Sequence, residues 1–355
     1  MKEKKYFPVS KFLPGNTLYL FASILVLISA ITQFAFSQND KVLFQLSAKK
    51  SLMGTEFEIT VVHSSIDTGK KAMYYALREV ERIEKVTSNY KDTTEISYVN
   101  RNAFGQPVKV SDELFNLIQR SIACSKRLDG LFDITVGPLT DYWGFNSDHP
   151  IETEPDKKII DSLLHFVNYK YLSLDTINKT ISFLKNGVSI DLGGIAKGYA
   201  LDKASEVLKR NGVSNFLING GGDLYARGLK ADGTKWKLGI KNPRDENKLL
   251  AVMEITDMCV ATSGDYERYK IINGKRYHHI FNPHDGFPAP LTQSSSVITQ
   301  TCEEGVVLSK YYFIMGYNKI NSSDYGKSHP FFIIDSEGKI HYNNSIEDYK
   351  LKITN

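Results

Sequence analysis

The alternation of hydrophobic and polar positions predicts paired strands near the start of the chain's body. Residues 42–46 read Val-Leu-Phe-Gln-Leu, and residues 55–62 read Thr-Glu-Phe-Glu-Ile-Thr-Val-Val. A period of two places alternate side chains on opposite faces of a sheet. Short apolar runs at 216–219 and 236–240 predict further strands, and strand-like segments flank Asn186-Gly187.

Helical periodicity marks a second group of segments. Apolar side chains recur every three to four residues, which is the spacing of one helix face, at 66–86, 112–128, 196–211 and 303–316. Asp112 is expected to cap the start of the second helix, while Gly212 and Gly316 are expected to end the last two. Residues 151–165 are expected to form a surface loop that leads into a helix.

Helices and strands are therefore mixed along the chain without strict alternation of strand and helix. This order favours an α+β fold in which mixed or antiparallel sheets pack with helices, rather than a doubly wound parallel sheet. The chain has 355 residues, of which 42% are hydrophobic, and no repeat or low-complexity linker divides it. We expect one catalytic domain over residues 40–355.

The first 37 residues have the pattern of an export signal. Four lysines precede an apolar run at 18–31, and the small residues Ala35 and Ser37 follow it. The run is shorter than the ~20 apolar residues that span a bilayer, so a cleaved signal peptide is favoured over an N-terminal membrane anchor. The protein is expected to be exported to the periplasm or the cell envelope, with inner-membrane anchoring as the alternative.

Charge and cysteine content exclude some classes of function. The formal net charge is +4, and the first 37 residues carry most of it, so the body is nearly neutral and has no basic cluster of the kind that binds nucleic acid. Cys124, Cys259 and Cys302 lie far apart and form no metal-binding pair. We expect all three to be small buried hydrophobic residues.

Two segments place polar side chains where they need partners. Asp133 and Thr135 lie inside the otherwise apolar run 130–139, so they either hold a turn together or contact a ligand. In 189–200, a carboxylate and two glycines precede a helix whose first turn contains Lys197. Such a turn can bind phosphate, although a simple strand-to-helix turn would have the same glycines.

Two further segments complete the candidate chemistry. Residues 218–228 contain three consecutive glycines and Asp223, which fits either a cofactor contact or a glycine-rich turn. His278, His279 and His284 fall in one short stretch. Histidine suits proton transfer near neutral pH. We interpret His278 and His284 as exposed loop residues and keep His279 as the candidate for chemistry.

These segments together resemble the FAD:protein FMN transferase family, the ApbE flavin transferases. The resemblance extends from Met53 to about Gly316 and rests on the order of seven motifs. They are Met53-Gly-Thr, Ser88-Asn-Tyr with Asn100-Arg101, Phe132-Asp-Ile-Thr-Val-Gly-Pro-Leu, Asp191-Leu-Gly-Gly-Ile-Ala-Lys-Gly, Asn219-Gly-Gly-Gly-Asp, Ala261-Thr-Ser-Gly-Asp-Tyr and His279-Ile-Phe-Asn-Pro.

The resemblance implies an ApbE-like fold and a phosphoryl-transfer reaction. A Thr or Ser hydroxyl of an acceptor protein would attack the FMN-side phosphorus of FAD, and AMP would leave. His279 is the candidate for proton handling, with Asp133 or Asp191 as the alternative base. The acceptor would be an exported flavoprotein or a membrane redox subunit. Positions that match cofactor contacts in the family are Met53, Tyr90, Leu131, Phe132, Asp133, Asp191, Lys197 and His279.

The chain departs from the family pattern at the expected magnesium site. The resemblance implies a main-chain ligand between Gly194 and Ala196, and Asp and Thr ligands on a helix that corresponds to 305–310. Here Val306 and Lys310 occupy those two positions, and Ser309 is a weak remaining ligand. We expect the Lys310 ammonium to replace part of the metal's charge. A degenerate FAD-binding protein and an FAD diphosphatase are the alternatives.

Overall fold

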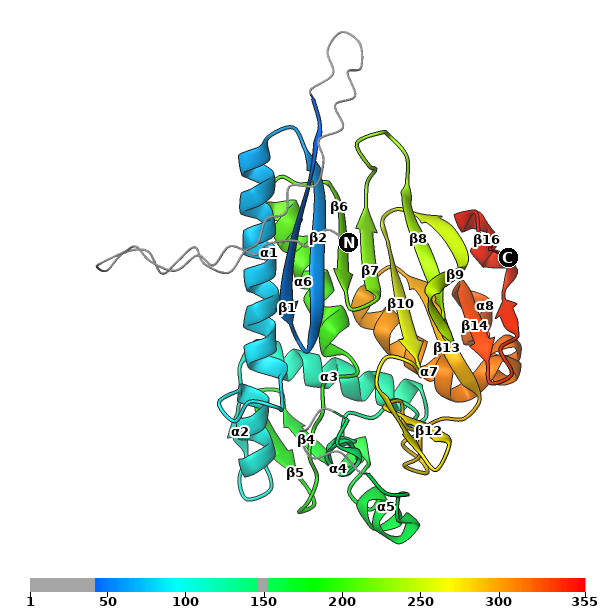
Figure 1. Cartoon of the computed structure of the whole chain (residues 1–355). Helices are drawn as coiled ribbons and strands as arrows, with labels where there is room; N and C mark the ends of the chain where they lie inside the picture. Colours follow the sequence, from blue (N-terminus) through cyan, green and yellow to red (C-terminus); the bar gives the residue numbers. More distant parts are fainter. Residues whose placement is uncertain (1–41, 146–151, 355) are drawn as a thin grey trace, which may run out of the picture.

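An eight-stranded sheet forms the centre of the protein (Figure 1), whose computed structural model describes residues 42–145 and 152–354. All neighbouring strands are antiparallel, in the order β1-β2-β6-β7-β10-β13-β14-β15. Their bounds are Phe44–Leu52, Thr55–His63, Asn215–Gly220, Asp223–Arg227, Met258–Gly264, Thr292–Thr299, Phe331–Asp335 and Ile340–Tyr342. The α+β prediction is confirmed.

Three long helices cover one face of this sheet. They are α1 (Ile66–Thr87), α6 (Ala196–Arg210) and α7 (Cys302–Ser322). The apolar stripe of each helix joins the inward side chains of the strands in one large core, which includes Phe57, Leu77 and Leu201. Burial of these stripes is the main force that holds the helices on the sheet.

A second, three-stranded sheet covers part of the opposite face. It has the order β16-β9-β8, with bounds Lys352–Ile353, Asp245–Ile255 and Trp236–Asn242. Trp236 and Met253 pack there with Ile298 and Phe332 of the central sheet. Every residue of β13 is consequently buried, because helix α7 lies on one face of it and this sheet lies on the other.

Shorter elements surround one end of the central sheet, the lower end in Figure 1. The helices are α2 (Glu95–Asn102), α3 (Asp112–Arg127), α4 (Gly137–Trp143) and α5 (Lys157–Leu164), with the 3₁₀ turn η1 (Tyr169–Tyr171). The strands are β3 (Val108–Lys109), β4 (Leu172–Asp175), β5 (Thr180–Phe183), β11 (Tyr269–Ile272) and β12 (Lys275–His278). Near the C-terminus lie α8 (Asp324–Ser328) and η2 (Asn344–Tyr349).

Most predicted elements are present, and two local expectations are wrong. Ser111, not Asp112, caps α3, because its side chain accepts from the backbone N–H of Leu114 at 3.2 Å. The hairpin around Asn186-Gly187 is absent: β4 and β5 turn at 176–179 instead, and only Ser189 forms an isolated bridge beyond the glycine, to Val136. The last long helix does end at Gly316, whose φ of 71° interrupts α7.

The remaining expectations concern cysteines and the N-terminus. Cys259 and Cys302 are buried and Cys124 is partly buried, and none forms a disulfide. The predicted signal at 1–37 lies outside the described residues, so it stays a prediction. Within the described ranges, every helix is too short or too polar to cross a bilayer.

Candidate functional site

Turns from three pairs of elements meet at one end of the sheet and enclose a cavity of about 590 Å³. The β1–β2 turn, the β6–β7 turn and the segment after β10 form part of its wall, together with the start of α6 and part of α7. Residues from the segments 84–91, 131–145 and 279–283 also line it. All nine predicted cofactor-binding residues line it: Met53, Tyr90, Leu131, Phe132, Asp133, Asp191, Lys197, His279 and Lys310. Residues scattered over most of the sequence thus share one site.

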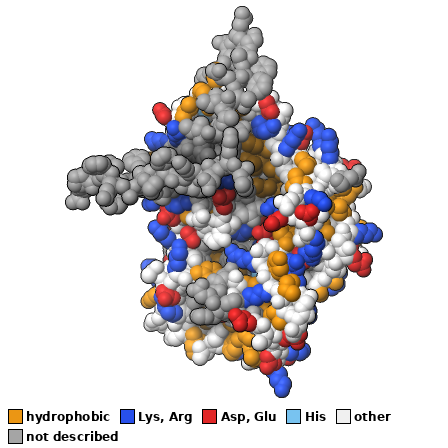
Figure 2. Space-filling model, viewed as in Figure 1, with side chains coloured by type: hydrophobic (Ala, Val, Ile, Leu, Met, Phe, Trp, Pro, Cys, Tyr) orange, Lys and Arg blue, Asp and Glu red, His pale blue; other side chains and the backbone are white. Residues whose placement is uncertain are grey.

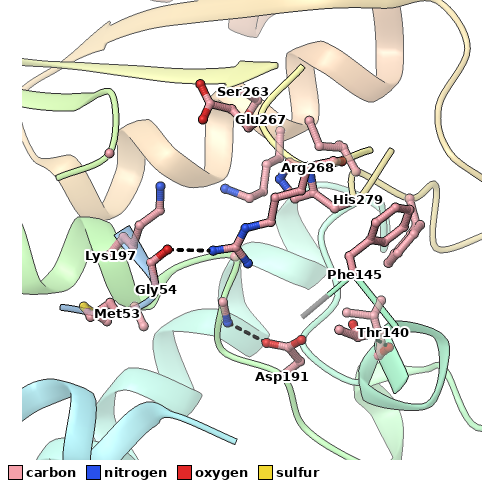
Figure 3. Close-up of a pocket in the computed structure, with 18 of the residues that line it drawn as sticks. Met53, Gly54, Thr140, Phe145, Asp191, Lys197, Ser263, Glu267, Arg268 and His279 are labelled. Carbon is pink, nitrogen blue, oxygen red and sulfur yellow. Dashed lines mark hydrogen bonds between the residues drawn. The ribbon is translucent and has the colours of Figure 1, made fainter. Parts of the chain in front are cut away.

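The β1–β2 turn is held in an uncommon backbone conformation. Leu52 pairs directly with Thr55, so Met53 and Gly54 form a two-residue turn, with φ of 52° and 71°. Positive φ at both positions is typical of tight hairpins, but it is disfavoured for a side chain as large as methionine. The turn holds Met53 at the cavity wall, where Figure 3 shows it beside Gly54.

Asp133 anchors the loop that carries Phe132. One carboxylate oxygen accepts from the Thr135 backbone N–H (2.8 Å) and hydroxyl (2.6 Å), and the other accepts from the Tyr169 backbone N–H (2.7 Å). Burial raises the pKa of Asp133 above its usual range, and the three donors act against that rise. Asp133 therefore lines the cavity with both oxygens engaged, so its role as a base stays a prediction.

The turn before α6 brings backbone N–H groups to the cavity. Asp191 accepts from the Gly193 N–H at 2.7 Å, which fixes the turn (Figure 3). Gly194 packs so closely against Phe132 that an added Cβ would lie 2.9 Å from its ring. Helix α6 then begins without a side-chain cap. An uncapped helix start next to a cavity favours a bound anion.

Lys197, in the first turn of α6, forms an ion pair with Asp223. The Lys197 ammonium lies 2.9 Å from one oxygen of Asp223, and the other oxygen accepts from the Thr262 backbone N–H at 3.1 Å. Asp223 is only 2% exposed and lies at the start of β7. The pair connects α6 to two strands and fixes where the Lys197 charge lies.

The residues expected to hold magnesium do not fit a divalent ion. Ser309 is fully buried, and its hydroxyl lies 2.9 Å from that of Ser263 and 3.2 Å from the carbonyl oxygen of Val306. The Val306 side chain is buried in the core, and the Lys310 side chain lines the cavity. Only the segment with Gly194 and Ala196 reaches the cavity as expected. No cluster of three or more His, Cys, Asp or Glu in the described residues could hold a metal.

His279 is oriented as a hydrogen-bond acceptor towards a reactant. Its backbone N–H and its Nδ1 both lie within hydrogen-bonding distance of the Arg268 carbonyl, at 3.1 and 3.2 Å. A carbonyl only accepts, so Nδ1 carries the proton and Nε2 keeps its lone pair. Burial, with Lys310 and Arg268 nearby, lowers the pKa of His279 to about 3, so the ring is neutral at neutral pH.

The other two histidines differ from each other. His284 is exposed, as expected. His278 is not an exposed loop residue: it is 5% exposed, its Nδ1 accepts from the Ile280 N–H (3.3 Å) and its Nε2 donates to the Ala289 carbonyl (3.1 Å). Burial lowers its pKa to about 4. The last two residues of β12, Tyr277 and His278, are both buried, and the sequence motif alone did not distinguish His278 from its neighbours.

Several residues of the cavity wall were not predicted. Arg268 extends across the cavity (Figure 3), and its guanidinium donates to the Gly54 carbonyl at 3.3 Å. Glu267, Thr140 and Phe145 also contribute to the wall. Arg268 lies two residues after the motif Ala261-Thr-Ser-Gly-Asp-Tyr, so its position close to that motif was an available signal. Thr140 and Phe145 follow the 130–139 motif, whose extent we underestimated.

Tyr90 stands at the cavity mouth, where 54% of its surface is exposed. An exposed aromatic ring at the entrance can stack on a flat ligand ring.

The face in Figure 2 has acidic and basic side chains interspersed, which agrees with the nearly neutral body of the chain.

Comparison with known proteins connects this cavity to one family. The ApbE family model matches residues 53–323, so the match begins at the Met53 turn and covers most of the chain. The chain belongs to the ApbE family. Relatives named FAD:protein FMN transferase include one from Vibrio cholerae (28% identical; 74% of this chain and 79% of the relative) and one from Klebsiella pneumoniae (32% identical; 68% and 74%).

Solved structures of ApbE proteins have the same fold. The ApbE protein from Thermotoga maritima superposes with a TM-score of 0.78 at 30% identity, covering 86% of this chain and 99% of the other. The flavin transferase ApbE from Vibrio cholerae gives a TM-score of 0.76 at 25% identity, with the same coverage. The resemblance that the seven motifs indicated is thereby confirmed.

Proposed function

We propose that this protein is an FAD:protein FMN transferase, which moves FMN from FAD to a Thr or Ser hydroxyl of an acceptor protein and releases AMP. The observation that carries this proposal is the convergence of the family's motifs on one cavity. That cavity has an exposed tyrosine, Tyr90, at its mouth, and Lys197 and Lys310 lie in its wall. Membership of a family whose relatives are named for this reaction supports the same assignment.

The cavity suits the two chemical parts of FAD. Tyr90 and Phe132 offer aromatic surface for a flat ring system. Lys197, Lys310 and the uncapped start of α6 offer positive charge and N–H donors for the diphosphate. Met53 and Leu131 add apolar wall. A largely apolar cavity with a few convergent polar groups is typical of cofactor sites.

The reaction exchanges one phosphorus–oxygen bond for another. The acceptor's hydroxyl oxygen bonds to the FMN-side phosphorus, and the bond from that phosphorus to the bridging oxygen breaks. The bridging oxygen leaves with the electron pair as part of AMP. Catalysis of such a transfer depends on positioning and on neutralisation of phosphate charge, which the two lysines supply.

The hydroxyl proton requires an acceptor, and we assign it to His279. The Arg268 carbonyl fixes the proton on Nδ1, so Nε2 is the free acceptor. Asp133 is the weaker candidate because its oxygens already accept three hydrogen bonds. Asp191 has one oxygen engaged by Gly193 and stays the alternative base.

A His279→Gln variant tests this assignment. Glutamine keeps an amide that can reach the Arg268 carbonyl but cannot take up the proton, so the transfer rate should fall by about 100-fold or more while FAD affinity changes little. Single-turnover rates and FAD titrations measure the two effects. Transfer at the rate of the unmodified protein would contradict the role of His279.

An FAD diphosphatase would give AMP and free FMN, because water would replace the acceptor hydroxyl. Chromatography of the reaction products distinguishes the two. For a transferase, AMP appears in proportion to added acceptor and little free FMN forms. Equal amounts of AMP and FMN without acceptor would overturn the proposal, and intact FAD under all conditions would indicate a binding protein.

The location and the acceptor are also proposals. The signal-like segment at 1–37 supports export to the periplasm or cell envelope, with membrane association through that segment as the alternative. An exported transferase would meet exported flavoproteins or membrane redox subunits as acceptors. Fusion of residues 1–40 to a reporter that is active only outside the cytoplasm tests this, and an inactive but expressed fusion would contradict export.

A further inference from the structure

Lys310 occupies the position on α7 at which the family resemblance implies a Thr ligand for the metal. Its side chain extends from α7 into the cavity wall, and its ammonium donates to the Val306 carbonyl of its own helix at 3.1 Å. An ammonium has three donors, so this bond leaves two for another partner. Among the described residues no carboxylate lies close enough to form an ion pair with Lys310, although Asp191 and Asp223 act on it electrostatically.

Lys310 is surrounded by one other ammonium group and by carboxylates that already have partners. Burial lowers the pKa of Lys310 to about 8; Lys197 adds to this effect, and Asp223 and Asp191 oppose it. Asp223 is engaged by Lys197 and by the Thr262 N–H, and Asp191 by the Gly193 N–H. Lys197 is therefore already paired with Asp223, whereas the Lys310 ammonium contacts only a main-chain carbonyl among the described residues, so a bound anion would satisfy its charge.

The packing of α7 explains why a metal site is not formed there. Val306 lies against Gly198 of α6, where an added Cβ would meet its Cγ2 at 2.7 Å. That contact commits position 306 to the core. The Ser309 hydroxyl is committed to Ser263 and to the carbonyl of Val306. Of these three α7 positions, only Lys310 therefore presents a polar group to the cavity.

We propose that Lys310 takes the place of the divalent ion, so that Lys197 and Lys310 together bind the FAD diphosphate and the protein needs no metal for binding or transfer. This inference rests on the proposed function, because it assumes FAD as the ligand. A lysine supplies one charge and flexible donors, whereas Mg²⁺ supplies two charges and a fixed octahedral geometry. Binding that depends on Lys310 should be insensitive to chelators.

The first test is calorimetric titration of the full chain with FAD, in EDTA and in excess MgCl₂. The expected result is the same Kd within about twofold in both conditions. Loss of binding in EDTA with recovery in magnesium would overturn the proposal. Because this titration does not require transfer, its outcome is separate from that of the proposed function: tight metal-free FAD binding without transfer would contradict the transferase and leave the lysine site standing.

The second test removes the charge and keeps most of the side-chain length. Lys310→Met should weaken FAD binding by about tenfold or more, because it removes a charge-assisted contact to the diphosphate. Affinity for riboflavin, which has no phosphate, should be unchanged. Lys209→Met at the exposed end of α6 is the matched control and should change neither affinity. Equal losses for FAD and riboflavin, or no loss for FAD, would contradict the role of Lys310.

Discussion

At the scale of single residues, the cavity is organised by polar groups that are already partnered. Asp133, Asp191 and Asp223 each accept a hydrogen bond from a backbone N–H group, and for Asp133 and Asp223 that donor belongs to a distant segment. Their charges therefore hold loops in place rather than remain free for chemistry. His279 and Lys310 differ, because each keeps an unused acceptor or donor. We expect the reaction to depend chiefly on these two.

Asp133→Asn separates an anchoring role from a catalytic one. Asparagine would turn an NH₂ group towards one of the three donors that the carboxylate now satisfies, and an unsatisfied buried N–H costs about 1–3 kcal/mol. We expect the free energy of unfolding to fall by that amount, as measured in urea. A stable variant that has lost transfer by 100-fold or more would instead identify Asp133 as the base.

His278 should make the protein sensitive to mild acid. Its pKa is about 4 in the folded protein and near 6.5 in an unfolded chain, so the unfolded state takes up a proton first as the pH falls. Burial of the neutral His278 ring therefore costs no stability above pH 6.5. As the pH falls from 6.5 towards 4, the free energy of unfolding falls by up to about 3 kcal/mol.

Urea unfolding of a His278→Gln variant between pH 7 and 4 measures this contribution. Glutamine can donate to the Ala289 carbonyl but does not titrate, so the variant should show a shallower dependence of stability on pH. Parallel curves for the variant and the unmodified protein would contradict the assignment.

At the scale of elements, the contact between α6 and α7 sets the distance between the two lysines. Gly198 of α6 lies against the backbone of Cys302, and a Cβ there would approach the Cys302 carbonyl oxygen to 2.2 Å. Lys197 and Lys310 are carried by these same two helices. A change that separates the helices should therefore also separate the charges.

Gly198→Ala tests this coupling. The added methyl has backbone atoms as its nearest neighbours, so the helices must move, at a cost of about 1–3 kcal/mol in unfolding free energy. FAD affinity should fall as well. Gly105→Ala is the matched control, because a Cβ at Gly105 meets nothing within 4 Å, and it should leave both quantities unchanged. Full stability with unaltered FAD binding in Gly198→Ala would contradict the coupling.

At the scale of the whole molecule, the sequence predicted the elements whose apolar pattern repeats over several turns of one segment. Long periodic helices such as 66–86 and 196–211 were predictable because each covers several turns of one apolar face. The Asn186-Gly187 hairpin failed because a turn signal does not say which segment pairs beyond it. The inward orientation of His278 and the Lys197–Asp223 pair depend on contacts between distant segments. Motif order could locate the cavity residues but not these partners.

The most direct test of the account is the intact mass of an acceptor protein after incubation with this protein and FAD. The matched control is the same acceptor with its target Thr replaced by Val. We predict that only the unmodified acceptor gains the mass of one FMN, that AMP appears in equal amount, and that EDTA does not prevent the gain. An acceptor that stays unchanged while FAD is bound and intact, repeated with a second acceptor, would contradict the transferase assignment.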